Sequence, residues 1–324
     1  MQKKIIINRC LILLAGIVFS VGLRAQSRPV PLLETPTDAR AAAMGGLTLM
    51  STDRSYLYTN PASIFSSDKN FTVSATGLLF ADQEEVSGRL KNCALSTGFR
   101  FLDRHVIYLG YRYQGGLKYP GVKDQFNDNN KENRPYDLTA DLGYAFKIND
   151  NFAVFASGNY IRSYVLSAAN SASFTIGGNY MSMLNIGANE SRLNVAARVA
   201  DIGKPVDYGY GRPTYSLPSK AELSGDISTD FSDLHRLTFA AGGRYYFLPR
   251  KASLFQCGMG AEYVYSDIVN FRAGYMYGEN ESSLWSAGFG LKYQDLKFDF
   301  AFMRNVKHSD LYKTMFTVSY DLKL

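Results

Sequence analysis

One short stretch at the carboxyl end constrains the fold of this chain more than any other part. From Thr314 to Leu324 the sequence reads T-M-F-T-V-S-Y-D-L-K-L, and from Phe316 onward every second side chain is large and apolar. Successive side chains of a strand point to opposite faces, so this stretch has one apolar wall and one polar wall. Its length of about eleven residues is enough to cross a bilayer as a tilted strand.

The same unit recurs along most of the chain, and we count about fourteen strand-like segments from Phe71 onward. Between residues 136 and 147, for example, Tyr, Leu, Ala, Leu, Tyr and Phe alternate with mostly polar or small residues. The pattern predicts an all-β protein, a transmembrane antiparallel β-barrel over residues 71–324. The expected strands are 71–80, 86–101, 105–114, 136–147, 151–164, 173–185, 191–200, 217–228, 235–247, 253–265, 269–277, 284–293, 296–303 and 314–324.

The links between these segments alternate in length. Those from even-numbered to odd-numbered strands are short, whereas several in the opposite sense are long. Outer-membrane barrels have short periplasmic turns and longer outer loops. We therefore predict a location in the outer membrane of a Gram-negative cell, with both chain termini in the periplasm. The short links are 102–104, 148–150, 266–268 and 294–295, and the long ones are 115–135, 201–216 and 304–313.

The first 25 residues have the features of a secretory signal peptide. A basic start is followed by an apolar run from Cys10 to Val21, and the small residue Ala25 precedes the predicted cleavage point. Residues 1–25 carry four basic residues and no acid, so the net charge of +6 becomes 6 − 4 = +2 in the mature chain. This small excess of positive charge does not predict a nucleic-acid partner.

Residues 26–70 lack the alternation, and we predict that they form a partly helical plug inside the barrel. An aspartate, a short alanine-rich run and two glycines have the pattern of a capped short helix. An Asn-Pro pair further along is typical of a second helix start. The candidate plug and gate residues are Asp38, Arg40, Met44, Gly45, Gly46, Asn60 and Pro61.

The two glycines of the plug have two interpretations. Met44, Gly45 and Gly46 could form a mobile gate that rearranges to pass a ligand, or the glycines could simply end the helix, which is the simpler interpretation.

Charges on the inward strand faces should pair with the plug, because a buried unpaired charge is costly. We expect Arg40 to pair with an acid such as Asp141, Glu262 or Asp299. The candidate luminal charges are Asp141, Arg244, Glu262, Arg272 and Asp299.

No pattern in the sequence indicates catalysis or a metal site. His105, His235 and His308 lie far apart, without acids or cysteines at the spacing of metal ligands. The sequence has no Gly-x-Ser-x-Gly motif and no clear arrangement of nucleophile and base. We therefore predict neither an enzyme nor a bound metal or cofactor, although a barrel enzyme remains a third hypothesis for the function.

Two motifs of the N-terminal segment resemble the PorV/PorQ family of outer-membrane proteins. They are residues 36–46, P-T-D-A-R-A-A-A-M-G-G, and residues 57–62, L-Y-T-N-P-A. Residues 193–203, L-N-V-A-A-R-V-A-D-I-G, and the pair Leu217-Pro218 resemble a mid-barrel strand of the family and the start of the next one. Ser63 departs from the family pattern, which has Gly there. This family lies within the larger group of barrels similar to the FadL fatty-acid transporter.

The resemblance implies a fourteen-stranded barrel with an N-terminal plug, and it implies two functions. PorV/PorQ members serve the type IX secretion system by binding secreted cargo or surface-attachment enzymes, and the motif order favours this docking role. The docking surface would then be the long loops 115–135 and 201–216. The alternative is a FadL-like channel for hydrophobic small molecules, which needs an apolar cavity between plug and wall, with an exit. The expected partners are outer-membrane lipid and, according to the function, secreted proteins or hydrophobic small molecules.

Overall fold

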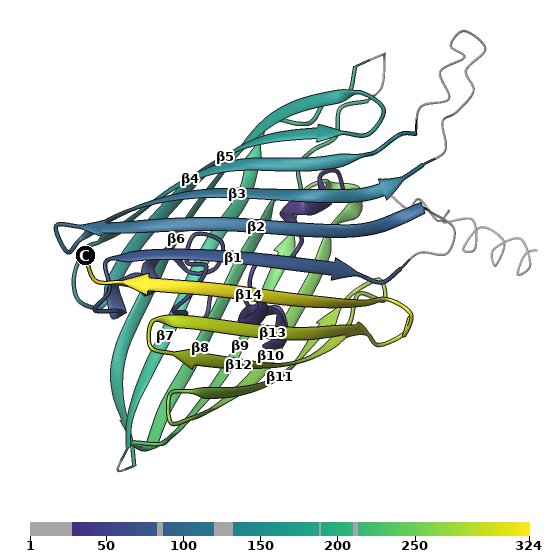
Figure 1. The fold of residues 1–324 in the computed structure, drawn as a ribbon. Coiled ribbons are helices and arrows are strands. Elements are labelled where there is room, and N and C mark those ends of the chain that lie inside the picture. The colour runs from purple at the N-terminus through teal and green to yellow at the C-terminus, as the bar shows by residue number, and fades with distance from the viewer. Residues whose placement is uncertain (1–27, 83–86, 120–131, 188, 210–212) are drawn as a thin grey trace, which may run out of the picture.

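The computed structural model describes residues 28–82, 87–119, 132–187, 189–209 and 213–324. Each strand pairs with its neighbours in sequence, and the first strand also pairs with the last, so the sheet closes on itself. The result is a closed antiparallel barrel of fourteen strands (Figure 1), which confirms the predicted fold class. The predicted signal peptide, residues 1–25, lies outside the described residues.

The strands follow one another around the barrel in sequence order. They are β1 (Phe71–Phe80), β2 (Ser87–Phe101), β3 (His105–Lys118), β4 (Tyr136–Lys147), β5 (Phe152–Tyr164), β6 (Ala168–Ile186), β7 (Asn189–Gly203), β8 (Lys220–Ser232), β9 (His235–Tyr246), β10 (Leu254–Tyr265), β11 (Val269–Gly278), β12 (Leu284–Tyr293), β13 (Leu296–Asn305) and β14 (Tyr312–Leu322).

The observed strands agree closely with the predicted ones, and β1, β4 and β12 have the predicted bounds. The largest difference concerns β6, which begins at Ala168 rather than at residue 173. β3 ends at Lys118 rather than at residue 114, and β8 runs from Lys220 to Ser232 rather than from residue 217 to 228. The early part of β6 carries small and polar side chains on both faces, so it lacks hydrophobic alternation. Before β8, Pro218 has no N–H to donate to a ladder.

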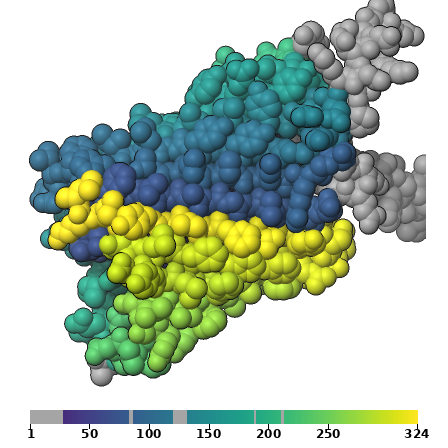
Figure 2. All heavy atoms as spheres, viewed as in Figure 1, coloured from purple at the N-terminus to yellow at the C-terminus, as the bar shows by residue number. Residues whose placement is uncertain are grey.

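The two faces of the wall differ in chemistry, as the alternation predicts. Phe239, Phe289 and Phe316 point outward and are 55%, 40% and 40% exposed, whereas the adjacent Thr238 and Thr317 are buried. The predicted orientation is therefore confirmed at these positions. Many other large apolar side chains are exposed on the outer wall, as in a barrel that spans a bilayer. Figure 2 shows β1 and β14 side by side in this wall, where the barrel closes.

The two ends of the barrel differ in the length of their links. The short-turn end carries the links that follow the even-numbered strands, such as 102–104 and 294–295. The long-loop end carries the links that follow the odd-numbered strands, such as 204–219. Phe71 pairs with Leu322, so β1 begins and β14 ends at the short-turn end. Which end faces the periplasm stays a prediction.

Residues 28–70 lie inside the barrel (Figure 1) and pack against its inward side chains. They contain η1 (Pro31–Leu33), α2 (Ala39–Ala43) and η2 (Pro61–Ser66), and a further short turn, η3 (Arg250–Ala252), lies in the β9–β10 link. Asp38 caps α2, because its side chain accepts a hydrogen bond from Ala41 N. Within the described ranges, no helix is long and apolar enough to cross a membrane.

The plug runs through the barrel from one end to the other. Arg28 Nη1 donates to Ala252 O at the long-loop end, whereas Asn70 N donates to Leu322 O at the short-turn end. The sequence-based prediction had the plug enter from the short-turn side, where both termini were expected. The first described residues lie at the opposite end, because Val30 and its neighbours are buried against apolar side chains there.

Candidate functional site

The helix α2 is seated against a part of the wall that is rich in glycine. A Cβ added at Gly274 would lie 2.1 Å from Gly45 N, and one added at Gly288 would lie 2.6 Å from Ala43 Cβ. Ser286 Oγ donates to Ala43 O at 2.9 Å and accepts from Gly45 N at 3.2 Å. A larger residue at either wall position would push α2 away, so this close approach fixes the helix against β11 and β12.

Gly45 and Gly46, which we considered as a gate or a helix end, have different surroundings. Both have positive φ, +72° and +73°, a conformation that favours glycine. A Cβ at Gly45 would lie 2.7 Å from Met259 O, whereas one at Gly46 would have Arg244 Nη2 as its nearest neighbour, at 3.5 Å. Met44, directly before them, is fully buried. Packing therefore holds Gly45 in place, and Gly46 has more room.

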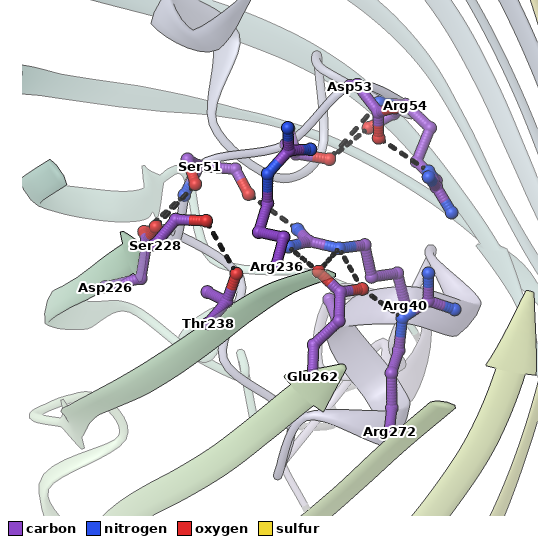
Figure 3. Close-up of polar contacts among 12 residues, drawn as sticks. Arg40, Ser51, Asp53, Arg54, Asp226, Ser228, Arg236, Thr238, Glu262 and Arg272 are labelled. Carbon is purple, nitrogen blue, oxygen red and sulfur yellow. Dashed lines mark hydrogen bonds and ion pairs between the residues drawn. The ribbon is translucent and has the colours of Figure 1, made fainter. Parts of the chain in front are cut away.

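Two arginines of the plug, Arg40 and Arg54, end a buried chain of ion pairs. Arg40 Nη2 donates to Glu262 Oε1 at 2.7 Å, and Arg40 Nε contacts the same carboxylate (Figure 3). Glu262 also accepts from Arg272, whose Nη1 lies 2.6 Å from Asp299 Oδ1. Asp299 in turn accepts from Arg54. All five side chains are buried, and their charges alternate along the chain, so each carboxylate is shared by two guanidinium groups.

Of the three acids that we named for Arg40, the structure brings Glu262 to it. Asp299 lies further along the same chain of ion pairs, because Arg272 pairs with both Glu262 and Asp299. The third, Asp141, belongs to a separate cluster on β3 and β4. It accepts from Arg112 Nη2 at 3.2 Å and from Tyr58 Oη of the plug at 2.7 Å.

Arg244 lies apart from both clusters, beside the turn that follows α2. Its Nε donates to Gln256 Oε1 at 2.7 Å, and its Nη1 lies 3.4 Å from Gly46 O and 4.0 Å from Glu222 Oε1. Glu222 also accepts from Arg198. The predicted luminal charges therefore fall into three clusters rather than one site.

Sequence reasoning missed a second part of the chain of ion pairs. Lys297 Nζ lies 2.9 Å from Asp53 Oδ2 and 2.5 Å from Asp321 Oδ2. Asp53 Oδ1 accepts from Arg54 Nε at 2.8 Å, which joins the two parts. Lys297 and Asp321 occupy inward positions of their strands, so the alternation could have found them. No sequence signal distinguishes Asp53 and Arg54 within the plug.

Asn60 and Pro61 begin η2 and also tie it to the wall. Asn60 Oδ1 accepts from Ala62 N at 3.3 Å, which is the expected cap. Its Nδ2 donates to Asn179 Oδ1 on β6 at 2.7 Å, and Pro61 O accepts from Tyr108 Oη at 2.6 Å. These two residues thus position the plug.

Polar hollows lie between the plug and the wall toward both ends of the barrel. The inner cavity, toward the long-loop end, has a volume of about 70 Å³, and the vestibule, toward the short-turn end, has about 210 Å³. Most residues around each hollow are polar or charged, so neither is the apolar passage that we expected of a hydrophobic channel. Wall residues of the inner cavity include Arg112, Asn159, Arg198, Lys220 and Glu222, and those of the vestibule include Arg192, Asp230, Arg236, Thr238 and Glu262.

An apolar hollow does occur on the outer face of the wall, over β7 to β10. This outer groove has a volume of about 680 Å³, and its lining includes Leu223, Ala241 and Phe255. A small hollow of about 10 Å³ lies inside the barrel, beside residues 45–48 of the plug. Gly242 and Gly243 border both hollows. Because glycine has no side chain, only the backbone of these two residues separates the inner hollow from the outer groove at this point.

The β7–β8 link was predicted to be part of an outer docking surface, and most of its described residues between 202 and 216 are exposed, although Val206 is buried. Val206 and Leu217 are buried with Val30 and Leu33 of the plug, because all four are apolar and meet at the long-loop end. The other predicted docking loop, 115–135, falls largely on residues 120–131, which lie outside the described residues.

Comparison with known proteins finds similarity in structure and not in sequence. No protein-family model matches the chain, and no curated protein matches its sequence. The toluene transporter TodX of Pseudomonas putida is 13% identical with a TM-score of 0.55, and the match covers 88% of this chain and 98% of that one. The toluene transporter TbuX of Ralstonia pickettii is 14% identical with a TM-score of 0.53, and the match covers 90% of this chain and 99% of that one. The monoaromatic hydrocarbon channel CymD is 16% identical with a TM-score of 0.54, and the match covers 92% of this chain and 99% of that one.

The chain has the fold of these hydrocarbon transporters. The similarity covers 88–92% of this chain and 98–99% of each of the three others. At 13–16% identity, the similarity shows a shared fold and no more. The narrower PorV/PorQ resemblance rests on the sequence motifs alone, since no comparison supports it.

Proposed function

We propose that this protein is an outer-membrane channel for small hydrophobic molecules. The observation that carries the proposal is the fold, which the chain shares along nearly its whole length with TodX, TbuX and CymD. The exposed apolar side chains of the outer wall favour a bilayer as its surroundings. The predicted signal peptide, residues 1–25, and the short and long links favour export and a periplasmic short-turn end.

The proposed route for a hydrophobic molecule crosses the wall near Gly242 and Gly243 rather than following the lumen. The polar lining of the inner cavity and vestibule would bind an apolar molecule poorly, because the charged groups of the lining would lose their contact with water. The outer groove is apolar, and residues 45–48 of the plug lie behind it. We place the candidate gate residue Gly46 at the inner end of this route, since it has more room than Gly45.

The test is to fill the outer groove and measure uptake of toluene by cells that produce the protein. Gly243→Leu would put a side chain into the groove, where the nearest neighbour of an added Cβ is Gln256 O at 3.3 Å. We expect a severalfold loss of toluene uptake with no loss of folded protein.

The matched control is Gly158→Leu, which adds the same side chain to the outer face of β5. An added Cβ at Gly158 has no neighbour within 4 Å, so this variant should transport toluene normally. Unchanged uptake by Gly243→Leu would contradict the proposed route, and no difference between cells with and without the protein would contradict the function itself.

The docking role that the motif order favoured has less support. The comparisons find hydrocarbon transporters with this fold and no protein that supports the PorV/PorQ resemblance. Val206 and Leu217 of the β7–β8 link are buried against the plug. Deletion of this link should therefore loosen the plug, so loss of a bound protein in such a variant would not identify a docking surface.

A further inference from the structure

Charged side chains on the outer wall of the barrel are distributed unevenly. Every aspartate and glutamate within the described strands occupies an inward position. Basic residues do occupy outward positions, namely Lys91 on β2, Arg162 on β5 and Arg304 on β13, and each lies close to the long-loop end of its strand. At the short-turn end, no lysine or arginine of a described strand points outward. Positive charge on this wall therefore belongs to one end of the barrel.

A row of tyrosines runs across the same end of the outer wall. It consists of Tyr113, Tyr136 and Tyr164, which come from the adjacent strands β3, β4 and β5 (Figure 1). The ring centroids of Tyr113 and Tyr136 are 6.3 Å apart, and those of Tyr136 and Tyr164 are 5.6 Å apart. The rings are nearly parallel, with interplanar angles of 21° and 20°. We call this strip of three stacked rings the tyrosine row.

Lys91 continues the tyrosine row on β2. Lys91 pairs with Gly115, and Gly115 pairs with Tyr136, so the lysine and the tyrosine are level across the sheet. Gly115 has no side chain, and a Cβ added there would lie 2.6 Å from Tyr113 Oη. Tyr113 therefore covers the position between them, and the strip from Lys91 to the last tyrosine has no gap.

Arg162 lies at the other side of the tyrosine row. It is two residues before Tyr164 and points to the same face of β5. Like Lys91, it is exposed, and neither of the two is part of an ion pair among the described residues. The strands of these two cations, β2 and β5, are three strand spacings apart, which is roughly 14 Å. Two positive charges thus stand at the sides of the row.

The hydroxyl groups of the tyrosine row have no hydrogen-bond partner among the described residues. The outward tyrosines of the short-turn end differ, because Tyr144 Oη and Tyr263 Oη each lie 2.6 Å from the Nδ1 atom of a histidine, His105 and His235 respectively. Tyrosine combines an apolar ring with a polar tip, so in a barrel wall it lies where lipid tails meet headgroups. The row therefore offers its hydroxyl groups to the headgroups at the long-loop end.

These groups match the head of a phosphorylated glycolipid. Lysine and arginine bind phosphate, and a guanidinium group can do so through two parallel hydrogen bonds. A tyrosine hydroxyl can both donate to and accept from the hydroxyl groups of a sugar. A phospholipid head carries one phosphate, whereas two cations roughly 14 Å apart suit a larger head with two. The acyl chains would lie against the apolar wall beside the row, where Leu138 points outward.

We propose that the outer wall over β2 to β5, at the long-loop end, binds a phosphorylated glycolipid of the outer leaflet. Lys91 and Arg162 hold its phosphate groups, and the tyrosine row contacts its sugar. An anionic leaflet at this end alone accounts for the basic residues at one end of the wall. The surface is separate from the outer groove over β7 to β10, so the proposal does not depend on the proposed transport.

The test is retention of bisphosphorylated lipid A by the purified, refolded protein in detergent, measured by native mass spectrometry. Lys91→Gln combined with Arg162→Gln removes both positive charges. We expect this double variant to retain severalfold less lipid A than the unaltered protein. Tyr136→Phe combined with Tyr164→Phe removes two hydroxyl groups and keeps the rings, and we expect a smaller loss.

The matched control is Lys251→Gln combined with Lys307→Gln. It changes the net charge by the same amount at the same end of the barrel, but both lysines are exposed in other links, β9–β10 and β13–β14. Its retention of lipid A should equal that of the unaltered protein.

Two results would overturn the proposal. One is equal retention of lipid A by the unaltered protein and the folded Lys91 and Arg162 double variant. The other is equal retention of lipid A and phosphatidylglycerol by the unaltered protein, which would indicate a surface for any anionic lipid. If the double variant does not fold, Lys91→Gln alone carries the same test. Toluene uptake should be unchanged in these variants, so failure of this proposal and failure of the proposed transport are distinguishable.

Discussion

At the scale of single residues, Glu262 is the group on which the plug's ion pairs depend most. It is buried and is shared by Arg40 and Arg272. We predict that Glu262→Ala lowers the free energy of unfolding by about 3–5 kcal/mol, since it leaves two buried guanidinium groups without their shared partner. Arg40→Ala should cost less, because Glu262 keeps Arg272. The measurement is the urea midpoint of the heat-modifiable folded form on gels.

An exposed ion pair provides the comparison for Glu262. Asp230 and Arg236 pair at the short-turn end, with side chains 54% and 39% exposed. Asp230→Ala should change stability by about 0–1 kcal/mol, because solvent screens such pairs. Equal losses in Glu262→Ala and Asp230→Ala would mean that the buried chain of ion pairs does not hold the plug.

A second prediction at this scale concerns the cost of arginine on each face of the wall. Phe316→Arg should cost about 2–4 kcal/mol if the position lies near the bilayer midplane. The alternation of lipid-facing and inward side chains by itself implies that arginine costs much less at inward positions. The structure restricts this to Thr238, which lines the vestibule, because Thr317 is fully buried and its Oγ1 accepts from Ala39 N at 2.9 Å.

The measurement is again the midpoint of unfolding, for the three arginine variants of Phe316, Thr317 and Thr238. We expect Thr238→Arg to be the mildest, and Thr317→Arg to displace α2 from the wall. If Thr317→Arg were as mild as Thr238→Arg, the plug would not pack against β14 as described.

At the scale of elements, α2 depends on the glycines of β11 and β12 more than on its own five residues. A helix so short has little stability of its own. We predict that Gly274→Ala displaces α2, because the new Cβ would lie 2.1 Å from Gly45 N. Amide hydrogen exchange of residues 39–46 should become faster, while exchange in the strands stays slow.

The matched control for this element is Gly158→Ala, at a position where an added Cβ meets nothing within 4 Å. Its exchange pattern should equal that of the unaltered protein. Slow exchange at residues 39–46 in Gly274→Ala would show that the wall can yield, and that the seat is less rigid than its distances imply.

At the scale of the whole molecule, the link lengths predict the orientation in the membrane. A short epitope inserted at Asp310, in the β13–β14 link, should be labelled on intact cells, and one at Asn149, in the β4–β5 link, should not. Asp128, in the long loop 115–135, is expected to be labelled in the same way from the link lengths alone, but it lies outside the described residues. Labelling at Asn149 alone would place the short-turn end outside the cell.

The barrel was predictable because its signal is local and repeated. In an outer-membrane strand the side chains alternate between lipid and lumen, so a run such as residues 314–324 carries its orientation within itself. The strand count follows from that signal, and so do the directions of Phe239 and Phe316. The signal fails at residues 168–172 of β6, because small and polar side chains occupy both faces of the strand there.

The candidate site was predictable only in its parts. Alternation places Glu262 and Asp299 on inward faces, and the caps place Asp38 and Asn60 at helix starts. Which groups meet depends on closure of the sheet: Arg40 and Glu262 are 222 residues apart in sequence. Pairings at such separation follow from the register of all the intervening strands, and no local pattern encodes them.

The hollows belong entirely to the three-dimensional arrangement. The inner cavity, the vestibule and the outer groove are spaces left between side chains from many strands, so each depends on where the plug comes to rest. The amino-acid sequence alone was sufficient for a plugged barrel with a polar lumen, because hydrophobic burial acts on each strand separately. The path of the plug and the thin wall at Gly242 and Gly243 exist only once fourteen strands have closed around the plug.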